Sequence, residues 1–380
     1  MKLISGGVTK AKGFKANGFW CGIKKSGKPD LALITSEVTA HCAAVFTKSS
    51  VKAAPLIVTQ KHTKNNQAQA IVVNSGNANC FTGSFGLMYA EKTTELFGKL
   101  LGIPKGDVLV ASTGIIGKPL PYNKIESSSE KLIKGLSATG AAKAAKAILT
   151  TDLASKEITT QIKIGGKVVT IGACAKGSGM TAPNMATMLA FITTDAAISK
   201  PMLKLALKEA VDQSFNCISV DGCMSTNDMV IILANGLAKN KMISARGKDF
   251  DTFYKALSFV CLELAKKIVL DGEGATKFIE IHVTGTESAT QARTVGLAIA
   301  NSNLVKTAAF GSDPNWGRVA AAVGSLGIAK ITEQNLKITF SSFKEKKIDI
   351  NVDLNLGKAK ATIYTSDLSY EYVRINGEYN

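Results

Sequence analysis

Residues 176–191 of this chain read KGSGMTAPNMATMLAF. Two glycines and one proline in its first half predict an irregular loop, and an apolar run begins at Thr187. Such a loop can expose backbone N–H groups beside the cation of Lys176, but the G-x-x-x-x-G-K-[ST] pattern of a phosphate-binding loop is absent. From composition alone, a phosphate cradle and a plain loop entering a buried strand both stay open.

Strand-like and helix-like segments alternate on both sides of this stretch. Strands are predicted over 31–35, 70–74, 107–111, 229–234 and 278–283, and helices over 89–101, 130–149, 201–213, 250–270, 288–301 and 316–323. Two hairpins are predicted, one from 161–163 and 167–171, the other from 348–354 and 361–364. This alternation predicts stacked α/β layers in which helices cover the sheets.

Length and composition indicate a globular protein. The 380 residues are 46% hydrophobic, which is enough for one large domain or two closely joined ones. No apolar run approaches the roughly 20 residues that cross a bilayer. The first residues contain neither an apolar signal core nor an Arg/Ser-rich leader. We therefore expect a soluble, cytoplasmic protein.

The net charge of +17 is concentrated in the first half of the chain. Residues 1–186 carry 24 basic and 9 acidic side chains, against 22 and 20 in residues 187–380. A basic half is compatible with nucleic-acid binding, but 42 of the 46 basic residues are Lys and aromatic residues do not interleave with them. The pattern favours a lysine-rich surface that attracts small anions.

Cysteine and histidine patterns give no sign of a metal site. The seven cysteines are scattered without a C-x-x-C pair, which argues against a disulfide framework or a thiolate zinc site and predicts mostly buried thiols. The three histidines lie far apart in the sequence and form no H-x-x-x-H pattern. Metal chemistry and a Ser-His triad are both disfavoured.

The 176–191 stretch resembles the signature of the ornithine acetyltransferase family, whose members move an acetyl group from N-acetylornithine to glutamate in arginine biosynthesis. Further blocks in the family's order are GIK (22–24), LALI (31–34), VFT (45–47), AAP (53–55), VNSGNAN (73–79), STGIIG (112–117), TTD (150–152), STND (225–228), DGEGATK (271–277), DPNWGR (313–318) and YVRIN (372–376). The resemblance therefore spans nearly the whole chain. One departure is Cys223-Met224, where the family usually has Asp-Thr, and it predicts a packing change near that loop.

The resemblance implies self-activation. Family members cut themselves at the bond that corresponds to Ala186–Thr187, so the chain would become fragments 1–186 and 187–380. The new N-terminal Thr187 would be the nucleophile. A threonine hydroxyl needs a base, and a free α-amine with a pKa of about 8 on the same residue can serve.

The remaining site residues also follow from the resemblance. The Thr113 hydroxyl and the Gly114 N–H would form an oxyanion hole, although a plain turn at the end of a strand is the alternative for these two residues. The matching substrate-binding positions are Thr150, Lys176, Thr187, Glu273 and Asn376. A ping-pong exchange through an acetyl-enzyme is expected.

The family further implies a four-layer α/β/β/α sandwich built by both fragments, similar to N-terminal-nucleophile enzymes, and an α2β2 heterotetramer. No cofactor or metal is expected, and acetyl-CoA is a possible second acetyl donor. No nucleic-acid or membrane partner is expected. Two alternatives stay open: an N-terminal-nucleophile amidase or aminopeptidase that uses water as acceptor, and a lysine-rich anion-binding protein without enzymatic activity.

Overall fold

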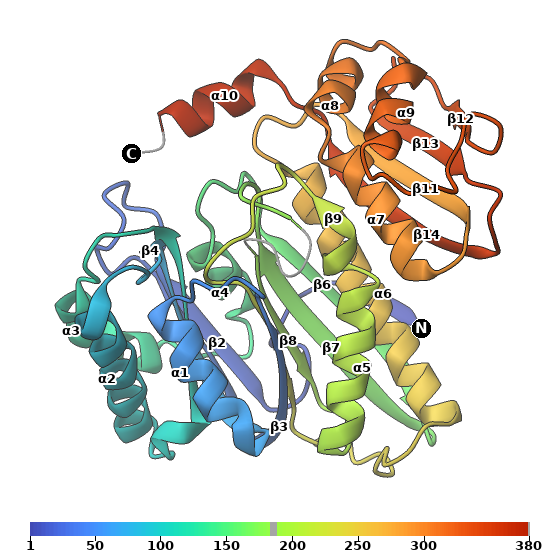
Figure 1. Cartoon of the computed structure of the whole chain (residues 1–380). Coiled ribbons are helices and arrows are strands. Elements are labelled where there is room, and N and C mark those ends of the chain that lie inside the picture. Colours follow the sequence, from blue (N-terminus) through green and yellow to red (C-terminus); the bar gives the residue numbers. More distant parts are fainter. Residues whose placement is uncertain (183–187, 379–380) are drawn as a thin grey trace. The chain divides into compact units, whose positions relative to one another are not determined.

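The computed structural model describes residues 1–182 and 188–378. Two compact units are present (Figure 1). Among the described residues, the first unit holds 1–177, 188–214 and 225–264, and the second holds 178–182, 215–224 and 265–378. Each unit has its own sheet.

The first unit is built on a nine-stranded sheet with the order β1-β6-β7-β8-β10-β3-β4-β5, and β2 pairs with β3. The strands are β1 (Lys2–Ile4), β2 (Phe14–Phe19), β3 (Leu31–Phe46), β4 (Gln67–Asn77), β5 (Val108–Ile115), β6 (Lys156–Ile164), β7 (Lys167–Lys176), β8 (Leu189–Thr194) and β10 (Met229–Ala234). Every residue of the central strands β8 and β10 is buried. Their near-continuous apolar sequence is typical of strands covered on both faces.

Helices cover both faces of this sheet. They are α1 (Ala54–His62), α2 (Gly83–Leu101), α3 (Tyr122–Lys134), α4 (Ala141–Ala147), α5 (Lys200–Asp212) and α6 (Lys248–Leu270), whose last turns belong to the second unit. Successive residues of β3 enter different cores: Ile34 packs in one with α4, and Leu33 in another with α2 and α3. This alternation follows from the period of two along a strand.

The single helix predicted over 130–149 is wrong, because α3 and α4 are separate. Between them, Ser137 exchanges backbone hydrogen bonds with Ala16 of β2, at 3.0 and 3.1 Å. At Gly140 an added Cβ would lie 1.7 Å from the Ala16 carbonyl oxygen. This close approach requires glycine and interrupts the Ala/Lys-rich helical pattern.

The second unit contains a five-stranded sheet with the order β12-β13-β11-β14-β9. Its strands are β9 (Ile218–Ser219), β11 (Phe278–Thr286), β12 (Lys337–Phe340), β13 (Lys347–Asp353) and β14 (Ala359–Ser366), and its helices are α7 (Ala289–Ala300), α8 (Asn303–Phe310), α9 (Trp316–Gly324) and α10 (Tyr370–Gly377). The hairpin predicted from 348–354 and 361–364 is wrong, since β11 lies between β13 and β14.

Both units combine sheets with covering helices, so the predicted α/β class is confirmed. The 161–171 hairpin is also confirmed as β6 and β7. Among the described residues, none of the helices combines the length and apolar character needed to cross a bilayer.

Candidate active site

Thr113 and Gly114 lie at the end of β5, where it pairs in parallel with β4 and Gly114 stands opposite Gly76. Gly114 has φ +128°, and an added Cβ would lie 2.4 Å from the Gly76 carbonyl carbon. Only glycine fits this backbone without displacing β4. Asn227 secures the same strand end, because its Nδ2 donates to the carbonyl oxygen of Ser112 at 2.8 Å.

Lys176, at the end of β7, reaches this strand end. Its side chain is only 2% exposed, and Nζ donates to Thr113 Oγ1 at 3.3 Å. The structure therefore brings together two residues that the sequence assigned separately, one to the oxyanion hole and one to substrate binding.

Asp152 organises the charges around Lys176. Its carboxylate accepts hydrogen bonds from Lys156 Nζ at 2.7 Å, from the Gly177 N–H at 2.7 Å and from the Thr150 N–H at 3.1 Å. Burial alone would raise the pKa of Asp152, but the charges of Lys176 and Lys156 and these hydrogen bonds lower the pKa to about 2. Thr150 is thus held to the same carboxylate as the Lys176–Gly177 turn.

Lys24 adds a third amine to this region. Its Nζ donates to the carbonyl oxygens of Pro29 and Leu149, each at 2.7 Å. Burial lowers the pKa of Lys24 to about 8, against the opposing pull of Asp30. The first unit therefore gathers lysine amines around the end of β7, which suits binding of an anionic group.

Glu273 and Asn376 meet in the second unit. Asn376 Nδ2 donates to Glu273 Oε2 at 2.8 Å, and the Glu273 N–H donates to the Ser178 carbonyl at 2.9 Å. At Gly179 an added Cβ would lie 2.2 Å from Glu273 Oε2, so this glycine lets the loop lie against the carboxylate. The Glu273 side chain is buried, at 9% exposure, and suits an amine.

Asp221 is a site residue that the sequence did not single out. Its carboxylate accepts from the N–H groups of Met180 at 2.6 Å and Thr181 at 2.8 Å, and from the Tyr372 hydroxyl at 3.2 Å. Burial and the Asp221 charge raise the pKa of Tyr372. Asp221 thereby fixes the loop just before the expected cleavage segment.

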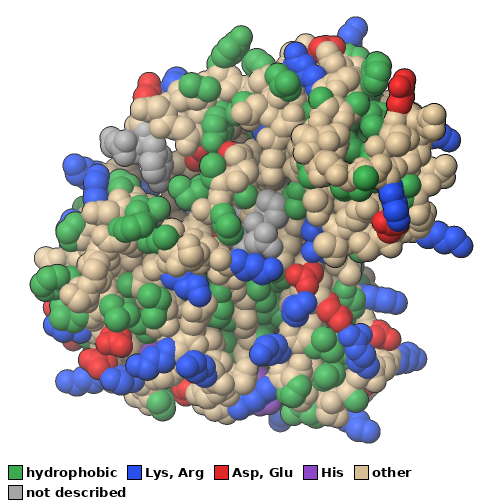
Figure 2. Space-filling view, in the orientation of Figure 1, with side chains coloured by type: hydrophobic (Ala, Val, Ile, Leu, Met, Phe, Trp, Pro, Cys, Tyr) green, Lys and Arg blue, Asp and Glu red, His purple; other side chains and the backbone are tan. Residues whose placement is uncertain are grey.

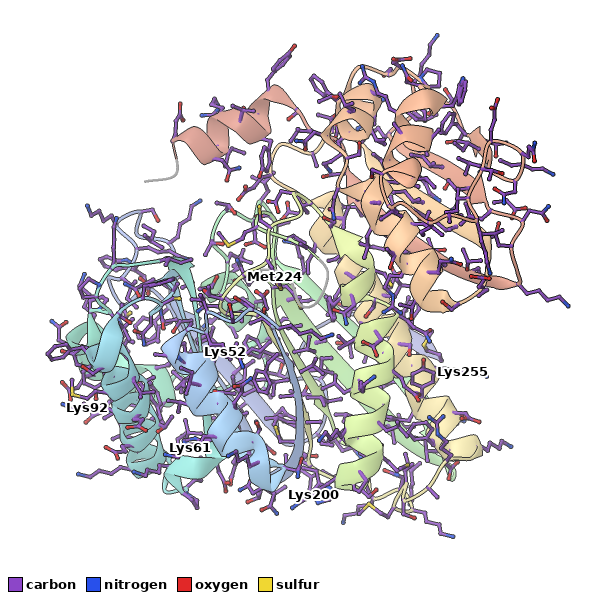
Figure 3. All side chains as sticks on the ribbon, in the orientation of Figure 1. Lys52, Lys61, Lys92, Lys200, Met224 and Lys255 are labelled. Atoms are coloured by element: carbon purple, nitrogen blue, oxygen red, sulfur yellow. The ribbon has the colours of Figure 1, made fainter. Side chains whose placement is uncertain are left out.

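The packing change expected at Cys223-Met224 stays a prediction. Cys223 is exposed. Met224, which is labelled in Figure 3, is 44% exposed. Ala186 and Thr187 lie outside the described residues. The first described residue after them is Met188, whose N–H donates to Asp228 Oδ1 at 3.0 Å.

A family model for ArgJ matches residues 15–380. The chain belongs to the ArgJ family. Two relatives named "Arginine biosynthesis bifunctional protein ArgJ" match 100% of this chain and 100% of their own length, at 46% identity in Caldanaerobacter subterraneus and 45% in Symbiobacterium thermophilum. A solved ArgJ chain from Bacillus halodurans is 43% identical, with a TM-score of 0.47 over 49% of this chain and 97% of that one. The recognition made from the sequence blocks is confirmed.

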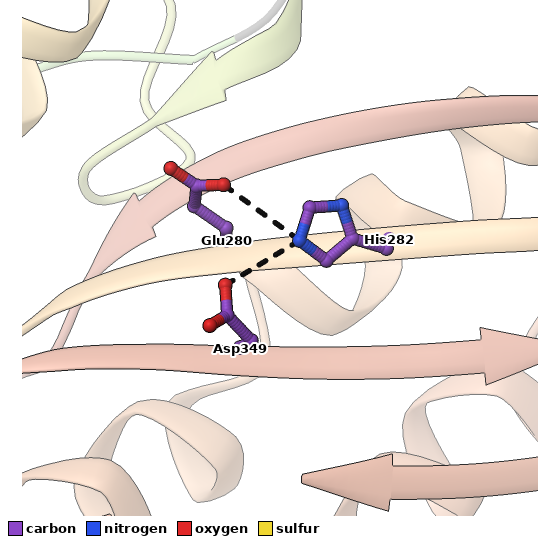
Figure 4. A group of neighbouring side chains, drawn as sticks. All are labelled: Glu280, His282 and Asp349. Carbon is purple, nitrogen blue, oxygen red and sulfur yellow. Dashed lines mark hydrogen bonds and ion pairs between the residues drawn. The ribbon is translucent and has the colours of Figure 1, made fainter. Parts of the chain in front are cut away.

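One cluster in this ArgJ-family chain has metal-like ligands. Glu280 and His282 of β11 and Asp349 of β13 place their ligand atoms within 4.8 Å of one another (Figure 4). Lys347 Nζ lies 3.4 Å from Glu280 and 3.6 Å from Asp349, and Lys266 Nζ lies 3.6 Å from Glu280. These amines already neutralise the carboxylates, so the cluster is an ion-pair network on the sheet. Sequence spacing could not find it, because two strands supply its members.

The basic surface of the first unit is dispersed. Lysines 52, 61, 92 and 255 are exposed and come from separate segments (Figure 3). On the face shown in Figure 2, basic side chains are scattered among polar and apolar ones. Five of the seven cysteines are buried, as predicted.

Proposed function

We propose that this chain is the acetyltransferase of arginine biosynthesis that moves the acetyl group of N2-acetyl-L-ornithine to L-glutamate. Full-length relatives that carry the name of a bifunctional arginine-biosynthesis protein support the pathway. The observation that carries the chemistry is the hydrogen bond from Lys176 to Thr113, beside the constrained Gly114.

The reaction begins with self-cleavage between Ala186 and Thr187, which frees the Thr187 α-amine. Thr187 Oγ then attacks the acetyl carbonyl, and the α-amine takes the hydroxyl proton. The Oγ–carbon bond forms and the carbon–N2 bond breaks, while the proton passes to the leaving ornithine amine. In the second half-reaction the α-amine of glutamate attacks the acetyl carbonyl, so that a carbon–nitrogen bond forms and the carbon–Oγ bond breaks. The proton lost by the glutamate amine passes through the Thr187 α-amine to Oγ and restores the hydroxyl.

The oxyanion of each tetrahedral intermediate is bound by Thr113 Oγ1 and the Gly114 N–H. One such donor is typically worth about 2.7–4 kcal/mol of barrier. Because Lys176 donates to Thr113 Oγ1, the threonine hydroxyl hydrogen is left to point elsewhere, toward a developing oxyanion. In this arrangement Lys176 also strengthens Thr113 as a donor, since a neighbouring cation polarises its oxygen.

Recognition of the two amino acids rests on opposite charges. The Lys176 amine, supported by Thr150, binds a substrate carboxylate. The Glu273 carboxylate, held by Asn376, binds a substrate amine. The word bifunctional in the relatives' names supports acetyl-CoA as a second acetyl donor. No cofactor or metal enters this scheme.

Fragments 1–186 and 187–380 remain together after the cut and assemble as α2β2. Strand pairing supports the first of these statements. β7 of the first fragment pairs antiparallel with β8 of the second, from Ile171↔Thr194 to Lys176↔Leu189. β10 of the second fragment pairs with β3 of the first over six residues. These two ladders support the proposal that the fragments stay in one sheet.

Intact mass under denaturing conditions tests the activation step. We expect two species, ending at Ala186 and beginning at Thr187, and a single uncut species for Thr187→Ala. A cut or active Thr187→Ala variant would refute the proposed nucleophile. Ornithine release from N-acetylornithine is then measured with and without glutamate. Release that needs no glutamate would indicate an amidase instead.

A further inference from the structure

Asp228 directly precedes β10, and Met188 directly precedes β8. The two strands run parallel and pair with Met229 opposite Leu189, so Asp228 and Met188 lie at the same end of adjacent strands. Asp228 Oδ1 accepts the Met188 N–H at 3.0 Å, and the Met229 N–H donates to the Met188 carbonyl at 3.3 Å. The residue that follows the expected nucleophile is therefore held from both its amide and its carbonyl.

The loop that carries Asp228 is itself firmly held. The Thr47 N–H donates to the Asp228 carbonyl at 3.0 Å, and Thr47 Oγ1 donates to the Ser225 carbonyl at 2.9 Å. Asn227 Nδ2 donates to the carbonyls of Ala78 and Ser112, at 2.7 and 2.8 Å. The same four-residue loop thus anchors Met188 on one side and the strand end before Thr113 on the other.

The Asp228 carboxyl is 1% exposed, and among the described residues its Oδ2 has no hydrogen-bond partner. Burial raises the pKa of Asp228 well above its ordinary value, against the opposing effects of Ser225, Met188 and Lys176. Burial therefore favours the protonated form of this carboxyl. A buried polar group of this kind is costly, and its retention calls for a role.

We infer that Asp228 is a positioning residue for Thr187, which it fixes through its hydrogen bond to the Met188 amide. This inference rests on the proposed function. Once cut, Thr187 is a chain end one residue from the last fixed amide, and chain ends fray unless they are tied down. Misplacing a reacting group by about 1 Å can cost about 100-fold in rate. Asp228 would thus serve both the self-cleavage and the acetyl transfer.

Two substitutions at Asp228 distinguish a role of its oxygen as a hydrogen-bond acceptor from a role of its carboxyl group in proton transfer. Asp228→Asn keeps an oxygen that can accept the Met188 N–H and keeps the shape of the side chain, but it has no ionisable proton. Asp228→Ala removes the acceptor. We expect Asp228→Ala to slow self-cleavage and to lower kcat by about 100-fold with little change in KM, and Asp228→Asn to stay within a few-fold of wild type.

Asp195 provides a matched control at the opposite end of β8. It is also 1% exposed and accepts backbone N–H groups, from Thr170 at 2.8 Å and Lys12 at 3.1 Å. Asp195→Ala should lower the melting temperature as Asp228→Ala does, yet leave cleavage and kcat within a few-fold of wild type.

The positioning role of Asp228 is tested by measuring intact mass over time and steady-state kinetics for wild type and the three variants. Asp228→Ala cut and active like wild type would overturn the role. Asp228→Asn as slow as Asp228→Ala would also overturn it, because proton transfer and not the accepting oxygen would then be required. Equal kinetic losses in Asp195→Ala and Asp228→Ala would reduce Asp228 to a structural residue. An uncut wild-type chain would instead refute the proposed function.

Discussion

Asp152→Asn tests the buried charge cluster at the end of β7. The substitution keeps the shape of the side chain but removes one negative charge near Lys156 and Lys176, each only 2% exposed. The pKa of Asp152 falls from 3.8 to about 2 in the folded chain, which corresponds to about 2 kcal/mol in favour of the carboxylate. Removing one partner of a buried ion pair costs about 3–5 kcal/mol. We expect the free energy of unfolding to fall by about 2–5 kcal/mol.

Glu130→Gln is the matched control. Lys134 and Glu130 form an ion pair with the same four-residue spacing as Lys156 and Asp152, but their side chains are 79% and 70% exposed. An exposed pair of this kind contributes about 0.5 kcal/mol or less. Burial is thus the main variable between the two substitutions.

The assay is urea unfolding at pH 7, followed by tryptophan fluorescence. Trp20 and Trp316 are the two tryptophans of the chain, one in each unit. In a Trp316→Phe background, Trp20 therefore reports on the first unit alone. A loss below 1 kcal/mol for Asp152→Asn, or one no larger than that of Glu130→Gln, would refute the reasoning.

Three further outcomes are expected. Because the pKa of Asp152 is lowered in the folded chain, the stabilisation by its carboxylate is complete above about pH 4 and is lost as the pH falls toward 2. The difference in unfolding free energy between wild type and Asp152→Asn should therefore shrink by about 2 kcal/mol across that window. A difference that stays constant would contradict the lowered pKa. Burial lowers the pKa of Lys306 to about 8 in the folded chain, so the unfolded chain binds the Lys306 proton more tightly and the free energy of unfolding should rise between pH 8 and 10. Lys306→Met should lack this rise when the fluorescence of Trp316 is followed in a Trp20→Phe background. An equal rise in Lys306→Met would count against the lowered pKa of Lys306. Gly114→Ala should lower the free energy of unfolding by more than about 2 kcal/mol, because strain at φ +128° adds to a clash with Gly76. Gly27→Ala, at φ +72° with no atom within 4 Å, should lower it by only about 1 kcal/mol. Equal urea midpoints for the two variants would contradict the clash.

Local sequence signals predicted several elements well. The apolar run 229–234 matches β10 at both ends, and the predicted strand 278–283 begins where β11 begins. The Ala/Lys-rich segment 130–149 was misjudged, because a distant partner, Ala16, pairs with Ser137. The tail hairpin failed for a related reason. A period of two tells which face of a strand is buried but not which strand lies beside it, and β11 takes that place.

In the site, too, the sequence identified residues but not their distant partners. The family blocks pointed to Thr113, Lys176 and Glu273, and the structure pairs the first two with each other and the third with Asn376. The blocks also contained the carboxylates of Asp152 and Asp228 but gave them no role, and Asp221 lies between two blocks. Their partners include backbone N–H groups, which every residue except proline carries, so no residue type marks the pairing.

The sheet order has a consequence for the timing of synthesis. β8 is joined to β3 only through β10, and β10 ends at Ala234. A nascent chain that has just passed Thr187 therefore lacks the strand that completes its sheet, and the Asp228 anchor for Met188 has not yet been made. Under the proposed mechanism, activation would then wait until the ribosome has added more than forty further residues, so that the reactive threonine is released only after the neighbouring strand β10 has been made.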